Sequence, residues 1–157
     1  MSILNRELTD IINNPSSLKS VATVSREGIP HVAYKGSLHV EGELLVFYDL
    51  IQSSQINKNL VNAIWYDKKV AVQVYLEDGA DKKCFLIHGK PVKCVTAGKE
   101  FEKVYLSLQD KFGKDTDLSA IWYIEPEKVR DETLRSRQKE EEEKYPYIMH
   151  LDRIVSV

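Results

Sequence analysis

The stretch Val70–Leu76, "VAVQVYL", decides the fold class of this chain. Large apolar residues stand at every second position in it, which is the period of a β-strand with one buried face. The residues "EDGAD" that follow suit a tight turn, and "KKCFLIHGKPVKCV" then reads as a long returning strand. Gly89 and Pro91 within that strand indicate a bulge, a bend or an edge. The stretch therefore predicts one long antiparallel hairpin.

Four further strands are expected around this hairpin. "LKSVATVS" takes up the same period and places Leu18, Ser20, Ala22 and Val24 on one face. "HVAYKGSLHV" follows a turn at Gly28, and "LLVFY" follows a turn at Gly42. The third of these is apolar on both faces. "LSAIWYIEP" reads as the sixth strand and is closed by Pro126. Six strands with mostly local connections predict a mainly β fold, a small and partly closed antiparallel barrel with helices at its margins.

Helical spacing of apolar residues occurs in three places. We expect a helix within residues 2–13, another in which Ile56, Leu60 and Ile64 share a face, and a third across "AGKEFEKVYLSLQDKF". The apolar face of the third helix is predicted to hold Phe101, Val104, Tyr105, Leu108 and Phe112. The last segment, residues 127–157, is a charged arm followed by an apolar tail. Such a tail needs a surface to pack on, either the barrel or a partner subunit.

Composition limits the class of protein. The 157 residues are 43% hydrophobic, which suits a single domain over residues 1–157. The net charge of −2 argues against a nucleic-acid binder. No run approaches the roughly 18 apolar residues of a membrane span, and the charged N-terminus is unlike a signal peptide. We therefore expect a cytoplasmic protein with neither a membrane nor a nucleic acid as its partner.

Motifs of known chemistry are missing from the sequence. It contains no GxSxG, HExxH or P-loop pattern, and its glycines never form GxG. The histidines are single and the cysteines unclustered, so no metal site is expected. No residue is assigned a catalytic role. Any chemistry is expected to belong to a cofactor.

One loop could hold such a cofactor. In "FYDLIQSSQINKNL", Phe47–Leu60, a strand passes through two serines into a helix. The first turn of a helix leaves N–H groups unpaired, so Ser53 and Ser54 could help to bind a phosphate, with Lys58 one turn later. Serine at this position more often caps the helix, and local chemistry alone favours capping.

The order of these segments adds a second kind of information. The strand at Leu18, the "REGIPHVAYK" hairpin, "LLVFYD", "SSQINKNL", "KKVAVQVYL" and "CFLIHGKPV" follow one another as in the pyridoxamine 5′-phosphate oxidase-like, FMN-binding split-barrel family. The resemblance covers about residues 18–125. It implies a six-stranded split β-barrel of Greek-key type, a homodimer, and FMN held noncovalently between the two subunits.

The resemblance also implies which residues meet the cofactor. The second strand would contact the flavin, the end of the third strand would add contacts, and the following helix start would hold the phosphate. These residues are His31, Val32, Ala33, Tyr34, Lys35, Tyr48, Asp49, Ser53, Ser54, Gln55, Lys58 and Asn59.

The function implied is an FMN-dependent oxidoreductase that transfers electrons or hydride, with NADH or NADPH as a transient reductant. The acidic arm lacks the arginine-rich C-terminal segment of true pyridoxamine phosphate oxidases, so oxidation of vitamin B6 is not expected. Two alternatives stay open. One is an FMN-binding electron carrier without a substrate. The other is a barrel that binds haem, a deazaflavin or nothing, because Ile56 stands where the family commonly has a basic residue.

Overall fold

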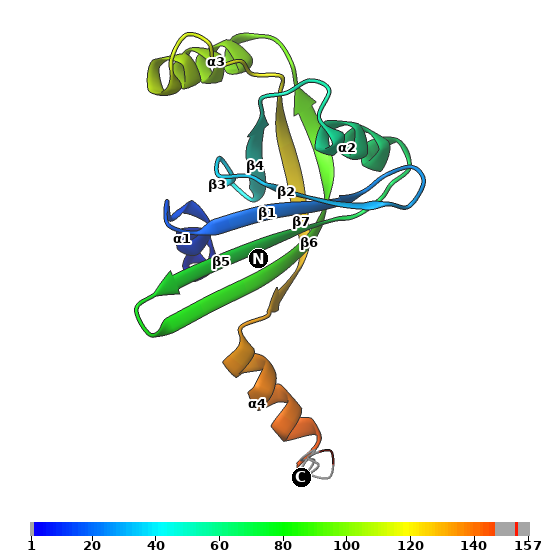
Figure 1. The fold of residues 1–157 in the computed structure, drawn as a ribbon, viewed down its shortest axis with the longest axis vertical. Coiled ribbons are helices and arrows are strands. Elements are labelled where there is room, and N and C mark those ends of the chain that lie inside the picture. Colours follow the sequence, from blue (N-terminus) through cyan, green and yellow to red (C-terminus); the bar gives the residue numbers. More distant parts are fainter. Residues whose placement is uncertain (1, 147–152, 154–157) are drawn as a thin grey trace.

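The computed structural model describes residues 2–146 and residue 153. Seven strands form one antiparallel sheet, and four helices lie around it (Figure 1). In chain order the elements are α1 (Arg6–Asn13), β1 (Leu18–Val24), β2 (Pro30–Tyr34), β3 (His39–Glu41), β4 (Leu44–Asp49), α2 (Gln55–Trp65), β5 (Val70–Asp78), β6 (Asp81–Val95), α3 (Lys99–Phe112), β7 (Ala120–Asp131) and α4 (Leu134–Lys144).

The long hairpin predicted from the sequence forms the middle of the sheet. β5 pairs with β6 from Val70↔Gly89 to Asp78↔Asp81. The other strands extend the sheet on both sides, in the order β2-β1-β5-β6-β7-β4-β3. The predicted irregularity is confirmed as well, because the register between β6 and β7 shifts at His88/Gly89 and again at Pro91/Lys93.

The prediction of six strands is wrong, because "HVAYKGSLHV" forms two. The Lys35 N–H donates to the carbonyl of Lys19, the last backbone contact toward β1, and the Leu38 N–H then closes a turn on the carbonyl of Lys35. β2 therefore pairs with β1, whereas β3 pairs with β4. One apparent strand thus supplies the two opposite edges of the sheet.

This split forces the sheet to curl. Only residues 35–38 separate β2 from β3, and so short a link spans at most about 18 Å. The edges of a flat sheet of this size would lie about 29 Å apart, at the usual strand spacing. The sheet must bend until its edges approach, without closing into a continuous barrel. The result is the split form of barrel.

Two apolar cores lie on opposite faces of β4 and β7. The larger fills the barrel and includes Phe47 and Trp122, both fully buried. The smaller lies between these strands and α3, and includes Val46 and Ile121. Neighbouring residues of β4 therefore face different cores, which explains why this strand is apolar on both faces.

Two helical faces differ from those predicted. In α2, Ile56, Leu60 and Ala63 are buried, whereas Ile64 is 43% exposed. Positions i, i+4 and i+7 keep to one side of a 3.6-residue helix, and i+8 drifts away from it. In α3, Phe112 was expected on the buried face but is 63% exposed.

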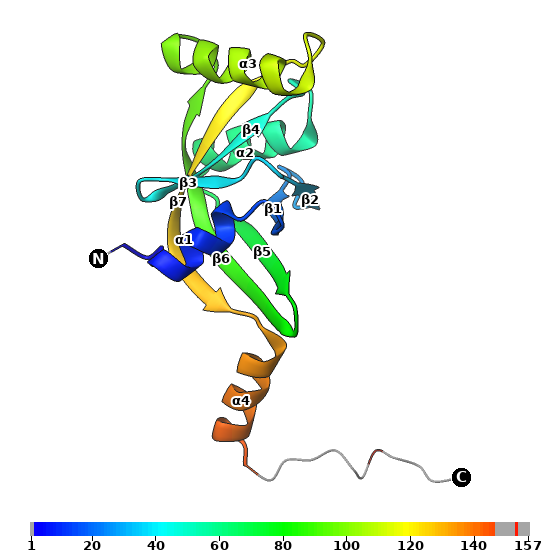
Figure 2. The ribbon, with the colours of Figure 1, turned by 90° about the vertical axis from the view of Figure 1, so that its left-hand side faces the viewer.

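The C-terminal arm begins later than expected. Residues 127–131 belong to β7, and the charged part forms α4, which has no buried residue. α4 leaves the barrel at the end opposite α3 (Figures 1 and 2). The predicted packing of the apolar tail, residues 147–157, falls outside the described residues apart from Arg153. None of the helices described is long and apolar enough to span a membrane.

Candidate functional site

Three of the predicted cofactor segments meet at one buried carboxylate. Asp49, at the end of β4, is 2% exposed. Its Oδ2 accepts a hydrogen bond of 2.6 Å from Ser54 Oγ, and its Oδ1 lies 3.3 Å from Lys35 Nζ. The end of β2, the end of β4 and the start of α2 are therefore joined in space. The structure thus brings together the three segments that the family resemblance implied for the cofactor.

Ser54 caps α2, as its local chemistry suggested. Its Oγ accepts from the N–H of Asn57 at 3.1 Å while its own proton points to Asp49. The Asp49 carboxylate is thus a negative charge of the protein's own near the positive end of the helix. It also neutralises Lys35. A phosphate bound here would have to share these donors with Asp49.

A second polar group lies under the same helix. Asn59 donates to Thr23 Oγ1 at 3.0 Å and accepts from Gln55 Nε2 at 2.8 Å. His31 is the cross-strand partner of Thr23, so both side chains are on one face of the sheet. The buried Nδ1 of His31 has no hydrogen-bond partner among the described residues, and Nδ2 of Asn62 has none either. Unpaired buried groups of this kind are open to a bound ligand or a water.

Sequence reasoning missed Thr23 and Asn62. Thr23 lies on β1, which was predicted as a strand from its spacing and not considered for binding. Asn62 lies on α2, beyond the loop whose residues were proposed as ligands. The signal that could have found Asn62 is its spacing: Gln55, Asn59 and Asn62 share one face of a helix, with polar groups where apolar ones are usual.

The remaining predicted residues are at the surface or half-buried. β2 is an edge strand, so one side of its backbone is unpaired with any described strand. The residues of this group whose side chains are exposed are Val32, Tyr34, Ser53, Gln55 and Lys58, whereas Ala33 is half-buried. No salt bridge of Lys58 occurs in the described part of the chain. It is the one cation of the predicted set with no carboxylate partner there.

Tyr48 connects this group to a pocket that the sequence did not predict. Its backbone N–H donates to Ser37 Oγ at 3.0 Å, and its ring packs edge-on against His39 with centroids 5.5 Å apart. Burial, with the charges of Glu41 and Glu100, raises the pKa of the Tyr48 phenol. The pocket has a volume of about 690 Å³. Its lining includes Lys19, Tyr34, Lys35, His39, Tyr48, Lys111 and Phe112.

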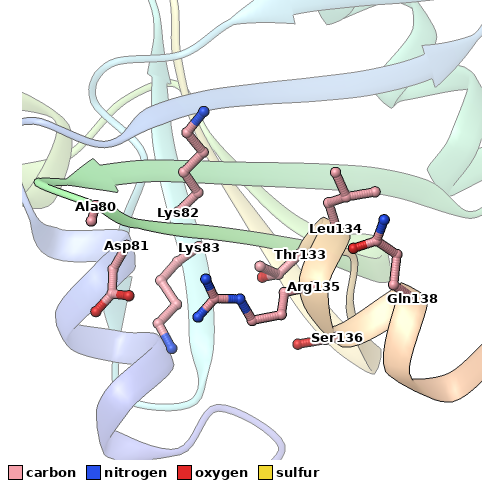
Figure 3. Close-up of a pocket in the computed structure, with 9 residues that line it drawn as sticks. All are labelled: Ala80, Asp81, Lys82, Lys83, Thr133, Leu134, Arg135, Ser136 and Gln138. Carbon is pink, nitrogen blue, oxygen red and sulfur yellow. The ribbon is translucent and has the colours of Figure 1, made fainter.

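A smaller pocket of about 350 Å³ lies between the β5–β6 turn and the start of α4 (Figure 3). Lys82, Lys83 and Arg135 line it together with Asp81. Lys83 also lies 3.6 Å from Glu7. None of the twelve predicted cofactor residues lines this pocket, so it is not part of the candidate site. The described residues also contain no cluster of His, Cys, Asp or Glu that could hold a metal ion.

Solved structures with the same fold include a protein named for FMN and another named for haem. HupZ of Group A Streptococcus matches at 20% identity over 83% of this chain and 94% of its own, with a TM-score of 0.62. An FMN-binding protein of Syntrophomonas wolfei matches at 17% over 84% and 90%, with a TM-score of 0.60. HutZ, the haem storage protein of Vibrio cholerae, matches at 15% over 83% and 95%, with a TM-score of 0.52.

These likenesses show the fold. Structures named for pyridoxamine 5′-phosphate oxidase are also among the matches. The chain therefore has the split-barrel fold of that group, and the resemblance seen in the sequence is confirmed at this level. No protein-family model and no curated protein matches the sequence.

The site fits the two ends of FMN unequally. A flavin ring needs apolar walls and a few fixed polar contacts. The exposed Val32 and Tyr34 of β2 offer apolar surface, while the strand's free edge and His31 Nδ1, which has no partner among the described residues, offer polar contacts. A phosphate dianion needs cations and free donors. Lys58 is available, but Lys35 and Ser54 are already bound to Asp49. The ring therefore fits better than the phosphate.

Proposed function

We propose that this chain is a flavoprotein that binds FMN noncovalently at β2, the end of β4 and the start of α2, and serves as an oxidoreductase. The observation that carries the proposal is the meeting of Lys35, Asp49 and Ser54, which come from these three segments. The fold supports it, because an FMN-binding protein of Syntrophomonas wolfei shares it. We infer that the ring lies along β2, with Tyr34 and Tyr48 beside it.

We propose further that two copies form a homodimer with a cofactor site at each side of the interface. β1, β2, the turn between them and α2 expose large apolar side chains, and burial of such side chains favours association with a second chain. A second copy that covers them would also wall the flavin from solvent. The exposed residues are Leu18, Val24, Ile29, Val32, Tyr34, Val61, Ile64, Trp65 and Tyr66.

Bound FMN would supply the redox step, and the chain's residues would hold and shelter it. The edge of β2 would fix the ring by backbone contacts. His31 and Asn62 offer buried polar atoms that have no hydrogen-bond partner in the described part of the chain. A reduced nicotinamide, NADH or NADPH, would bind transiently over the ring, because the chain has no Rossmann motif for it.

The same site would serve an electron carrier without a substrate of its own. The pocket of about 690 Å³ beside Tyr34, Lys35 and Tyr48 favours an enzyme, because a carrier needs no such space. Steady-state oxidation of NADH and NADPH by the flavin-loaded protein separates the two. Turnover with a common electron acceptor supports the enzyme, and its absence with every acceptor tried leaves the carrier.

The pairing of Asp49 with Ser54 and Lys35 also gives a specific reason to keep a second candidate cofactor. The Asp49 carboxylate occupies the donors that a phosphate would use. A ligand whose binding depends less on phosphate would therefore suit the site. This keeps a deazaflavin and haem as the second candidate, and HutZ is a haem storage protein with the same fold.

The first test is the visible absorption spectrum of the protein after incubation with FMN and gel filtration. Retention of the flavin bands at micromolar protein is expected. Replacing Ser54 and Lys58 together by alanine should then weaken FMN binding about tenfold, because the cation at Lys58 is lost and the helix start loses the serine that holds Asp49 and the N–H of Asn57. Replacing Lys68, an exposed lysine just beyond α2, should leave affinity unchanged. Loss of all flavin bands from the native protein would contradict the proposal.

A further inference from the structure

The pocket of about 690 Å³ is a second candidate binding site, beside the one proposed for FMN. It lies between the link from β2 to β3 and the last turns of α3, and the end of β4 forms part of its wall. Lys19, Lys35, Lys111 and His39 line it. Among the described residues that line it there is no aspartate or glutamate. This is unusual in a chain whose net charge is −2.

Lys19 is the most informative of these cations, because it is 4% exposed. Its Nζ donates to the carbonyl of Leu38 at 2.7 Å and to the carbonyl of Ile12 at 3.1 Å. An ammonium group has three donors, and the described residues supply acceptors for two. No salt bridge of Lys19 occurs among them. Burial lowers the pKa of this amine.

A buried ammonium without a counter-ion is unfavourable. Lys35 does not share this problem, since Asp49 neutralises it. The fold keeps Lys19 inside all the same, beside the pocket that it lines, and its third proton has no acceptor among the described residues. An anion bound there would supply both the missing acceptor and the missing charge.

The walls of the pocket indicate what kind of anion would fit. Tyr34, Tyr48 and Phe112 contribute aromatic rings, and Leu38 and Leu50 contribute apolar surface. Phe112 is 63% exposed, although its spacing placed it on the buried face of α3. A planar ring in the pocket would cover it. A volume of this size suits a small organic molecule better than an inorganic ion.

We propose that this pocket binds a small aromatic carboxylate, with the carboxylate at Lys19 and the ring against Tyr48 and Phe112. Lys111, at the mouth, adds a second positive charge. The pocket would bind its ligand in the absence of flavin. Tyr34, Lys35 and Tyr48 belong to both sites, so the ligand would lie next to the proposed flavin and would be placed as a substrate for it.

The test uses the full chain without flavin and compares benzoate with benzamide, which has the same shape and no charge. Titration followed by ¹H–¹⁵N NMR should show benzoate binding about tenfold tighter or more, with shifts at Tyr48 and Phe112. Lys19→Met should abolish this preference. Lys139→Met, an exposed lysine on α4 that has no salt bridge in the described chain, should leave it unchanged.

Lys19 also joins α1 to the barrel, so Lys19→Met could fail to fold, which circular dichroism would reveal. Lys111→Met avoids this risk, because Lys111 is exposed, and it should lower the preference for benzoate about threefold or more. Equal affinities of the native protein for benzoate and benzamide would overturn the inference. So would a preference that neither lysine variant reduces. FMN retention is measured separately, so either proposal can fail alone.

Discussion

Asp49→Ser should strengthen FMN binding by about tenfold or more. In the native protein the Asp49 carboxylate takes the proton of Ser54 and pairs with Lys35. Removing it frees both groups for a phosphate and removes a like charge a few ångströms away. Two unit charges about 5 Å apart interact by about 3 kcal/mol at an effective dielectric constant near 20, and 1.4 kcal/mol is already tenfold.

Quenching of FMN fluorescence during titration measures this change. Riboflavin is the control ligand, because it carries the same ring without the phosphate and should bind both proteins equally. Asp49→Asn is the control variant, since it removes the charge but keeps the shape and should gain nearly as much affinity. Unchanged FMN affinity in both variants would mean that the phosphate binds away from Asp49. A parallel gain for riboflavin would assign the effect to the ring.

Gly89→Ala should lower the free energy of unfolding by about 3 kcal/mol. A methyl group at Gly89 would lie 2.4 Å from the backbone oxygen of Glu125 and 3.0 Å from Cγ2 of Ile124. Both belong to β7, which pairs with β6 at this point. The oxygen is backbone and cannot swing aside, so the central pair of strands must separate locally. Overpacking of this kind is among the more damaging single substitutions.

Urea unfolding followed by tryptophan fluorescence measures this loss, since Trp122 is fully buried. Gly36→Ala is the matched control. Its methyl group would meet only the side chain of Tyr34, at 3.3 Å, which can move. We expect a change of less than about 1 kcal/mol there. If the two variants lose equal stability, the contact between Gly89 and β7 is not what fixes glycine at this position.

The sequence predicted what periodicity and turn residues control. The hairpin of β5 and β6 follows from alternating residues and a glycine turn, which are local signals. The division of "HVAYKGSLHV" into two edge strands does not follow from local signals. It depends on which strands pair with each half of the segment. A run of residues does not reveal its neighbours in the sheet, so the strand count was one short.

β1 shows a related limit. Its spacing placed Leu18, Ser20, Ala22 and Val24 on one face of the strand. The spacing did not indicate which of the two faces is buried. The buried residues are Lys19, Val21 and Thr23, two of them polar. Lys19 and Thr23 are tolerated there because distant carbonyls and Asn59 supply their partners. Partners of this kind come from tertiary structure and leave no mark on the strand's own sequence.

The candidate site, too, could be predicted from the sequence only in part. Through the family resemblance, the order of the segments implied that β2, the end of β4 and the start of α2 would contact one cofactor. It did not show that Asp49 would occupy the phosphate donors, since a carboxylate in a sequence gives no indication of its partner.

The short link of residues 35–38 has a consequence for how the two proposed sites communicate. It forms a wall that both of them share: Lys35 reaches Asp49 on the side of the flavin, and the carbonyl of Leu38 holds Lys19 on the side of the pocket. A ligand that changes the position of Lys19 or Lys35 would therefore also shift the link of residues 35–38. Thermodynamic linkage then requires reciprocity: whatever factor a carboxylate applies to flavin affinity, flavin must apply to carboxylate affinity.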